Sequence, residues 1–166
     1  MLCTFRGEFG QKIDAKGRVS IPAQIRKVLD AGDPDRESGE DPNLIIVFGD
    51  TTRSCLLGYS QQAMAEVEAK IHAMKASPRK KALVKAFLTL SWEARVDTTG
   101  RIVLPKHLRT RLGLGETGEL TFAGGGEKFE IWNSVDYEAE AAAFDLTEVE
   151  GYEEGMDLSE LLDMED

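Results

Sequence analysis

Residues 12–29 read KIDAKGRVSIPAQIRKVL, and residues 95–112, which begin 83 positions later, read RVDTTGRIVLPKHLRTRL. Six of the 18 aligned positions are identical, and five more exchange similar side chains. The identical pairs are Asp14 and Asp97, Gly17 and Gly100, Arg18 and Arg101, Pro22 and Pro105, Arg26 and Arg109, and Leu29 and Leu112. A repeat in fixed register indicates one supersecondary unit used twice, because a short unit can bury its apolar face against its own copy. We therefore predict two small units that share one core.

The apolar pattern around each copy predicts strands and one short helix. Residues 5–13 and 88–96 alternate apolar and polar side chains, which is typical of a strand with one buried face. Short strands should follow at 18–21 and 101–104, and Pro22 and Pro105 suit the first position of a helix. Two more strands close each unit, at 44–48 with 54–59 and at 119–122 with 128–132. The glycines at 124–126 are interpreted as a hairpin turn. The predicted fold class is α+β, with a ββαββ unit used twice.

Two segments fall outside the repeat. Between the units, residues 60–75 place Met64, Val67, Ile71 and Met74 on one helical stripe, and Ser77-Pro78 begins a second helix with basic residues in its first turn. In the first unit, the stretch from Pro22 to Ser60 is nine residues longer than its counterpart from Pro105 to Ser134. The excess lies in Ala31–Asn43, which is polar and rich in Gly, Pro and acids, so we expect a surface loop there.

Composition narrows the class of protein. The 166 residues are 42% apolar and 30% charged, and no apolar run is long enough for a membrane span. The first residues do not resemble a signal peptide, so we expect a cytoplasmic protein. Cys3 and Cys55 stand far apart with only two histidines in the chain, which predicts incidental or buried thiols and no metal site. No pattern of catalytic residues is present, so we expect neither an enzyme nor a cofactor.

The negative net charge of −10 is unevenly distributed. Residues 134–166 hold 13 acidic and no basic side chains, so the other 133 residues hold 17 acidic and 20 basic side chains, a net charge of +3. A mildly basic body with an acidic tail is typical of proteins that bind nucleic acid. Taken alone, the tail is more simply interpreted as a solvated segment.

The repeated motif carries the chemistry. Asp14 and Asp97 can accept backbone N–H groups at the start of a turn, and Gly17 and Gly100 permit the positive φ of a tight reversal. Arg18 and Arg101 then begin the next strand on its outward face. Lys12 and Arg95 end the incoming strand on the outward face, so each turn should present two cations. The simpler alternative is that each Asp and Arg only closes its turn by an ion pair. Turn closure, however, does not require the second cation, which recurs at the same position in both copies.

Together these residues resemble the MraZ family of bacterial transcriptional regulators, which is built from two AbrB-like swapped-hairpin modules. Three features carry the resemblance: the opening Phe5-Arg6-Gly7-Glu8, the paired Asp-x-x-Gly-Arg motifs with their Ile-Pro and Leu-Pro junctions, and the closing Lys128–Trp132 hairpin. It extends from about Phe5 to Asp145. We therefore expect a first module at residues 5–60, a linking helical pair at 61–87, a second module at 88–145 and an acidic tail at 146–166, with the modules packed as an intrachain pseudo-dimer.

The resemblance implies a nucleoid-associated regulator, typically a repressor of its own division and cell-wall operon, that binds tandem repeats in promoter DNA. It also implies assembly into a ring, such as an octamer or a dodecamer. The role of DNA contact falls first to Arg18 and Arg101, with Lys16 as a weaker candidate. The second copy departs from the family pattern because Thr99 stands at the position of Lys16. The segment Met1–Thr4 and the long acidic tail are further departures.

Two other functions remain open from the sequence. An antitoxin of a toxin–antitoxin pair can use the same AbrB-like module and carry an acidic partner-binding tail, although such proteins usually hold one module. A structural or interaction protein would require both turns to be purely architectural.

Overall fold

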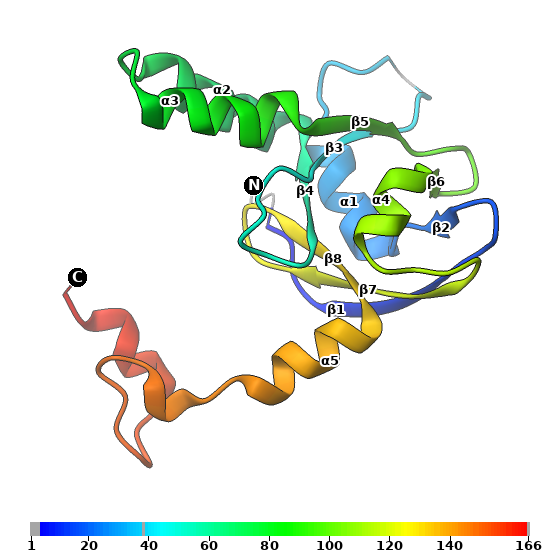
Figure 1. The fold of residues 1–166 in the computed structure, drawn as a ribbon. Coiled ribbons are helices and arrows are strands. Elements are labelled where there is room, and N and C mark those ends of the chain that lie inside the picture. The colour runs from blue at the N-terminus through cyan, green and yellow to red at the C-terminus, as the bar shows by residue number, and fades with distance from the viewer. Residues whose placement is uncertain (1–3, 38, 166) are drawn as a thin grey trace.

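The computed structural model describes residues 4–37 and 39–165 (Figure 1). Each half of the chain forms two strands, a helix and two strands, which confirms the predicted ββαββ repeat. The first half contains β1 (Glu8–Ile13), β2 (Arg18–Ser20), α1 (Ala23–Ala31), β3 (Asn43–Val47) and β4 (Leu56–Ser60). The second half contains β5 (Ser91–Arg95), β6 (Arg101–Val103), α4 (Lys106–Arg111), β7 (Gly118–Gly124) and β8 (Phe129–Asn133).

The eight strands form one antiparallel sheet in the order β5-β3-β4-β8-β7-β1-β2-β6. Four of the pairings join one module to the other: β1 with β7, β2 with β6, β3 with β5 and β4 with β8. The sheet curls into a nearly closed barrel, whose two end strands, β5 and β6, meet at their connecting turn through the Asp97 N–H and the Arg101 carbonyl, 2.8 Å apart. The two modules are therefore interleaved and cannot be separated as side-by-side domains.

An approximate two-fold axis relates the modules. It passes between β2 and β6, where Val19 lies opposite Ile102. The same symmetry appears in two hydrogen bonds of equal length: Leu104 N–H donates to the Gly17 carbonyl at 2.8 Å, and Ile21 N–H donates to the Gly100 carbonyl at 2.8 Å. Each turn is thus fastened to the strand-to-helix junction of the other module.

A single core fills the barrel, as the repeat predicts. The inward faces of the strands supply alternate residues, and α1 and α4 contribute their apolar stripes, because a short amphipathic helix is stable only when that stripe is covered. The equivalent residues Val19 and Ile102, Ile21 and Leu104, Ile25 and Leu108, and Leu29 and Leu112 are all buried in this one cluster. Pro22 and Pro105 cap their helices, which begin one residue later than predicted.

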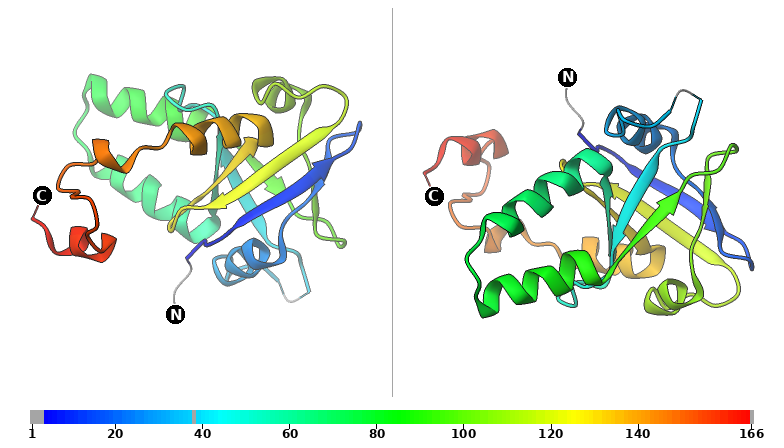
Figure 2. Two further views of the ribbon diagram at one scale, coloured as in Figure 1. Left: turned by 90° about the horizontal axis from the view of Figure 1, so that it is seen from below. Right: turned by 90° about the horizontal axis from the view of Figure 1, so that it is seen from above.

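The linking segment forms a helical hairpin that extends away from the barrel (Figure 2). It consists of α2 (Gln61–Ala73) and α3 (Pro78–Val84), followed by a π-helical turn at Lys85–Thr89. The hydroxyls of Ser60 and Ser77 accept N–H groups from Ala63 and Lys80, each at 3.1 Å, and so cap the two helices. The strand predicted from Leu88 is wrong at its start, since the helical hydrogen bonding continues through Thr89 and β5 begins at Ser91.

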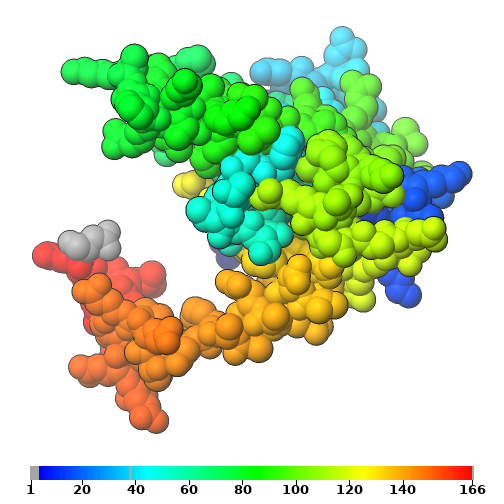
Figure 3. Space-filling model, viewed as in Figure 1, coloured from blue at the N-terminus to red at the C-terminus, as the bar shows by residue number. Residues whose placement is uncertain are grey.

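After β8 the chain forms α5 (Ser134–Ala143), which the sequence did not single out, and then the acidic tail. The tail contains two short 3-10 helices, Leu146–Glu148 and Leu158–Asp163. In the space-filling view the tail stands out from the barrel, on the same side as the α2–α3 hairpin (Figure 3). No helix among the described residues is long and apolar enough to cross a membrane. Cys55 is buried, as expected, whereas Cys3 lies outside the described residues.

The aromatic contacts of Phe129 predict how much the shared core contributes to the stability of the two interleaved modules. Phe129 of β8 is fully buried, and its ring lies 4.9 Å from that of Phe5 and 6.1 Å from that of Phe122. Phe129→Ala should lower the free energy of unfolding in urea denaturation by about 3–5 kcal/mol, because it removes a large apolar group and leaves a cavity. Val135→Ala, at a position that is 73% exposed, should change it by less than about 0.5 kcal/mol. Equal effects would contradict the assignment of Phe129 to the shared core.

Candidate nucleic-acid interface

The turn between β1 and β2, residues 14–17, is organised by one carboxylate. Asp14 Oδ1 accepts the backbone N–H groups of Lys16 at 3.0 Å and Arg18 at 2.9 Å. Asp14 Oδ2 accepts Nε of Arg18 at 2.6 Å, in an ion pair whose side chains are each 40% exposed. Gly17 closes the turn with φ +87° and donates its N–H to the Asp14 carbonyl. The predicted turn-shaping geometry of Asp14 and Gly17 is thus present.

The turn between β5 and β6, residues 97–100, repeats this geometry with one change. Asp97 Oδ1 accepts the N–H groups of Thr99 at 2.9 Å and Arg101 at 3.0 Å, and Gly100 has φ +81°. The Thr99 hydroxyl donates to Asp97 Oδ1 at 2.7 Å and accepts Nε of Arg101 at 2.9 Å. Nε of Arg101 therefore lies 3.6 Å from Asp97 Oδ2, which makes a looser ion pair than in the first turn.

Hydrogen bonding favours the ionised form of both aspartates. The pKa of Asp14 lies below its ordinary value, first because the backbone N–H of Arg18 donates to the carboxylate. The side chain of Arg18 and the backbone N–H of Lys16 also donate to it and lower its pKa further. The pKa of Asp97 is also lowered, first by the Arg101 backbone N–H and next by the Thr99 hydroxyl. Both turns are consequently ordered around a fixed negative charge that neutralises part of the neighbouring guanidinium.

The pairing of β2 with β6 brings the two arginines onto one face. Arg18 lies opposite Val103 and Ser20 lies opposite Arg101, so the arginines sit diagonally on the face opposite Val19 and Ile102. A shallow hollow of about 600 Å³ lies beside them, and its charged lining residues are Lys12, Arg18, Arg101, Asp14 and Glu119. The predicted cations Lys12, Arg18 and Arg101 are therefore together, whereas Arg95 lines a different hollow.

The ion pair of the first turn does not occupy the whole guanidinium. It engages Nε of Arg18, and within the described residues neither terminal nitrogen of Arg18 forms a hydrogen bond. Turn closure and ligand contact are thus compatible, because a guanidinium has five donors in a planar fork. The terminal nitrogens suit paired acceptors such as two phosphate oxygens or the O6 and N7 atoms of guanine.

A family model described as "MraZ protein, putative antitoxin-like" matches residues 88–151. Over 140 residues the chain is 47% identical to the transcriptional regulator MraZ of Ruegeria pomeroyi, which covers 84% of this chain and 83% of that protein. A protein of the same name from Ruegeria sp. strain TM1040 is 45% identical over 135 residues, 81% of this chain and 80% of its own. The transcriptional regulator MraZ of Coxiella burnetii is 30% identical over 135 residues, which are 81% of this chain and 82% of that protein.

The chain belongs to the MraZ family. This confirms the resemblance inferred from the repeated motif, and with it the AbrB-like fold. The family model covers the second module, whereas the alignments with the relatives are 135–140 residues long and so extend well beyond either module alone.

Sequence reasoning missed a second pair of arginines in this MraZ-family fold. Arg109 of α4 reaches across to the first turn, where its Nη1 donates to the Ala15 carbonyl at 3.2 Å. Arg26, its equivalent in α1, lies against Gly100 of the second turn. Each turn is therefore covered by an arginine from the helix of the other module. The sequence did mark these arginines, because they are identical in the two copies of the repeat. Their contacts could not be read from it, because they depend on the exchange of strands between the modules.

The tight packing of Gly17 gives a test of this arrangement. A Cβ added at Gly17 would lie 2.6 Å from the Leu104 carbonyl oxygen, whereas one at Gly126 would meet nothing within 4 Å, although its φ of +86° is almost the same. Gly126→Ala should therefore cost only the positive-φ strain, about 1–2 kcal/mol. Gly17→Ala should cost about 1–3 kcal/mol more in urea denaturation because the methyl overlaps backbone. Equal losses would show that the first turn does not press on the Leu104 junction.

The lowered pKa values of Asp14 and Asp97 predict that the stability of the fold depends on pH. A carboxyl with a lower pKa in the folded than in the unfolded state stabilises the fold fully above its unfolded pKa, and this contribution is lost as the pH falls through the folded pKa. A carbon-detected NMR titration should place both midpoints below the ordinary value of 3.8. Arg18→Ala should raise the Asp14 midpoint only part of the way, because alanine retains the backbone N–H. A midpoint of 3.8 or above in the unaltered protein would contradict the turn geometry.

Proposed function

We propose that this protein is a transcriptional regulator that binds double-stranded promoter DNA through the β2–β6 ribbon and its two turns. The observation that carries the proposal is the placement of Arg18 and Arg101, from different modules, on one outward face beside a hollow that also contains Lys12. Lys16 lies on the exposed surface of the first turn and supplies a further point charge. The relatives named as transcriptional regulators support this role.

The geometry suits recognition by arginine on a rigid support. Asp14 and Asp97 hold the turns, Gly17 and Gly100 allow them to reverse, and the paired strands fix the spacing between the two guanidinium groups. Contacts to phosphate would position the protein, and a contact to a base edge would add sequence preference. A few cations per chain give only weak binding, so tight binding requires several chains on repeated sites. Assembly into a ring, such as an octamer or a dodecamer, on tandem promoter repeats would meet this requirement.

The finer assignments follow from the family resemblance. We propose that the protein is cytoplasmic and associated with the nucleoid, and that it represses its own division and cell-wall operon. The proposal gives the chain no catalytic role and no cofactor.

The antitoxin function remains the second candidate, because the acidic tail and the antitoxin-like description of the matching family model both favour it. Recovery of a small toxin bound to the tail, with no promoter binding, would select the antitoxin function.

Removal of both motif arginines tests the proposal. Arg18→Ala/Arg101→Ala should weaken binding to the protein's own upstream promoter by at least about 30-fold in a fluorescence anisotropy titration, since each well-placed arginine contributes about 1–3 kcal/mol. Arg79→Ala/Lys81→Ala removes two exposed cations from α3, away from the turns, and should change the affinity by less than about threefold. Light scattering should give the same assembly size for all three proteins.

Two results would count against the proposal in different ways. Unaltered binding of the Arg18→Ala/Arg101→Ala protein would show that the interface lies elsewhere. Absence of any salt-dependent preference of the unaltered protein for its promoter over scrambled DNA would remove the regulator function itself.

A further inference from the structure

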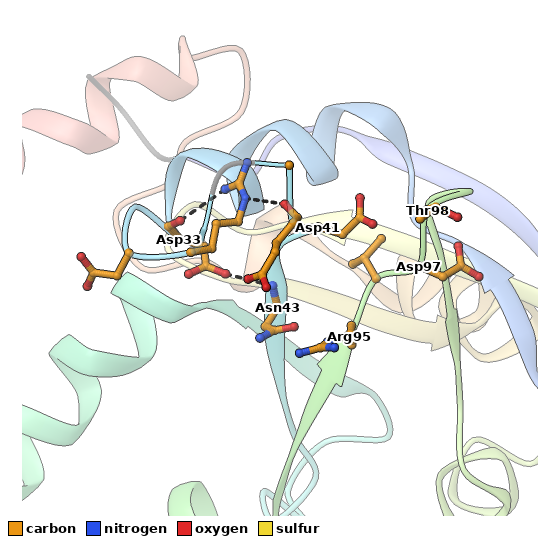
Figure 4. Close-up of a pocket in the computed structure, with 11 residues that line it drawn as sticks. Asp33, Asp41, Asn43, Arg95, Asp97 and Thr98 are labelled. Carbon is orange, nitrogen blue, oxygen red and sulfur yellow. Dashed lines mark hydrogen bonds between the residues drawn. The ribbon is translucent and has the colours of Figure 1, made fainter.

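Two hollows that differ in charge share three equivalent residue pairs of the repeat, which are Lys12 and Arg95, Ile13 and Val96, and Asp14 and Asp97. The first, beside the β1–β2 turn, is lined by three basic and two acidic residues, a net charge of +1. The second, beside the β5–β6 turn, has a volume of about 510 Å³ and is lined by two basic and five acidic residues, a net charge of −3 (Figure 4). Its basic residues are Arg36 and Arg95. Arg95 is the equivalent of Lys12, so equivalent cations stand in opposite surroundings.

The difference originates in the connection between α1 and β3, residues 32–42, which is the longer loop that the sequence predicts. Four of the five acids of the second hollow belong to it: Asp33, Asp35, Glu40 and Asp41. The corresponding connection between α4 and β7 is shorter and places only Thr117 near the first hollow, followed by Gly118 and Glu119 of β7. Because β3 pairs with β5, the insertion in the first module lies beside the turn of the second.

The acidic connection is held in place by its own hydrogen bonds. Arg36 donates to the carbonyls of Asp30 at 2.7 Å and Glu40 at 2.8 Å, and it pairs with the Asp30 carboxylate at 3.1 Å. Asp33 is 8% exposed and accepts the Asn43 N–H at 3.0 Å. Arg36 therefore uses its positive charge to join the connection to the end of α1, while Asp35 and Glu40 remain on the exposed surface of the connection.

The two turns differ in charge in the same direction as the two hollows, because the first turn is the more positive. Lys16 of the first turn is exposed, and it takes part in none of the ion pairs found among residues 4–37 and 39–165. Thr99 occupies the equivalent position in the second turn and carries no charge. The first hollow thus adds a nearby free ammonium group to its net positive charge, and the second hollow adds none.

We infer that the DNA backbone is seated at the first hollow alone, over Lys12, Lys16, Arg18 and Arg101, and that the acidic α1–β3 connection excludes Arg95 from DNA contact. The inference rests on the proposed function and revises the equal role that the repeat predicts for Lys12 and Arg95. Phosphates approaching Arg95 meet carboxylates that line the same hollow, and salt screens charges only over a Debye length of about 8 Å at physiological salt. Each chain therefore presents one DNA-binding hollow, not two related by the internal symmetry.

The equivalent residues Lys12 and Arg95 provide a matched test. In anisotropy titrations with the full-length protein and its upstream promoter, Lys12→Ala should weaken binding by about 5- to 10-fold and reduce the slope of log K against log salt by about 1. Arg95→Ala should change the affinity by less than about twofold and leave the slope unaltered.

Neutralising the connection should then recruit Arg95. Asp35→Asn/Glu40→Gln/Asp41→Asn leaves Asp33 and the Arg36 contacts to backbone intact, and it should tighten binding by about 5-fold or more as repulsion from phosphate is removed. In this background Arg95→Ala should cost about 5-fold, which it does not in the unaltered protein. Glu153→Gln/Glu154→Gln/Glu160→Gln removes the same charge from the exposed tail and should leave the affinity within twofold.

Two outcomes would overturn the inference while leaving the proposed function in place. One is an equal loss from Lys12→Ala and Arg95→Ala. The other is equal tightening by the tail variant, which would assign the effect to net charge. Failure of the proposed function is distinguishable, because either the unaltered protein would show no salt-dependent preference for its promoter, or the Arg18→Ala/Arg101→Ala protein would bind the promoter equally well.

Discussion

The pairing of β2 with β6 is the constraint on which the rest of the structure depends. Each strand has only three residues and follows its own turn, yet its partner belongs to the other module. The pairing fastens the Gly17 and Gly100 carbonyls to the junctions at Leu104 and Ile21, and it sets both helices over the shared core. It also determines the interface, because Arg18 and Arg101 share a face only when these two strands are neighbours. Architecture and candidate function therefore rest on the same three-residue ladder.

Strand exchange has a second consequence, which is that a change in one module acts on the other. Arg109 of the second module covers the first turn, and Arg26 of the first covers the second. In the same way, the long α1–β3 connection alters the surroundings of Arg95 and leaves those of its own turn unaltered. An internal repeat can thus keep its symmetric core while its surface becomes asymmetric, because an insertion at one loop changes only one of two equivalent hollows.

The sequence predicted what depends on local pattern. Alternation predicted most strands, the Asp-x-x-Gly-Arg motifs predicted the turns, and Ser60 and Ser77 predicted where two helices begin. It could not specify which strands pair, since alternation identifies a buried face but not its neighbour. For that reason it missed the contacts of Arg26 and Arg109 and did not show that Arg95 lines a hollow together with the acids of the α1–β3 connection. The error at Leu88 has a different cause: the apolar residues of a π-helical turn and of a strand look alike in so short a segment.

The charge of the chain illustrates why position matters more than total. A net charge of −10 would argue against binding a polyanion if it were spread evenly. All of the negative excess, however, lies on α5 and the tail, and the tail lies on the side of the barrel away from the two turns (Figures 1 and 2). Ions screen exposed charges over about 8 Å, so within one chain the carboxylates of the tail act weakly on the β2–β6 ribbon. The few acids of the α1–β3 connection, which line a hollow with Arg95, have far more influence on where a phosphate can approach.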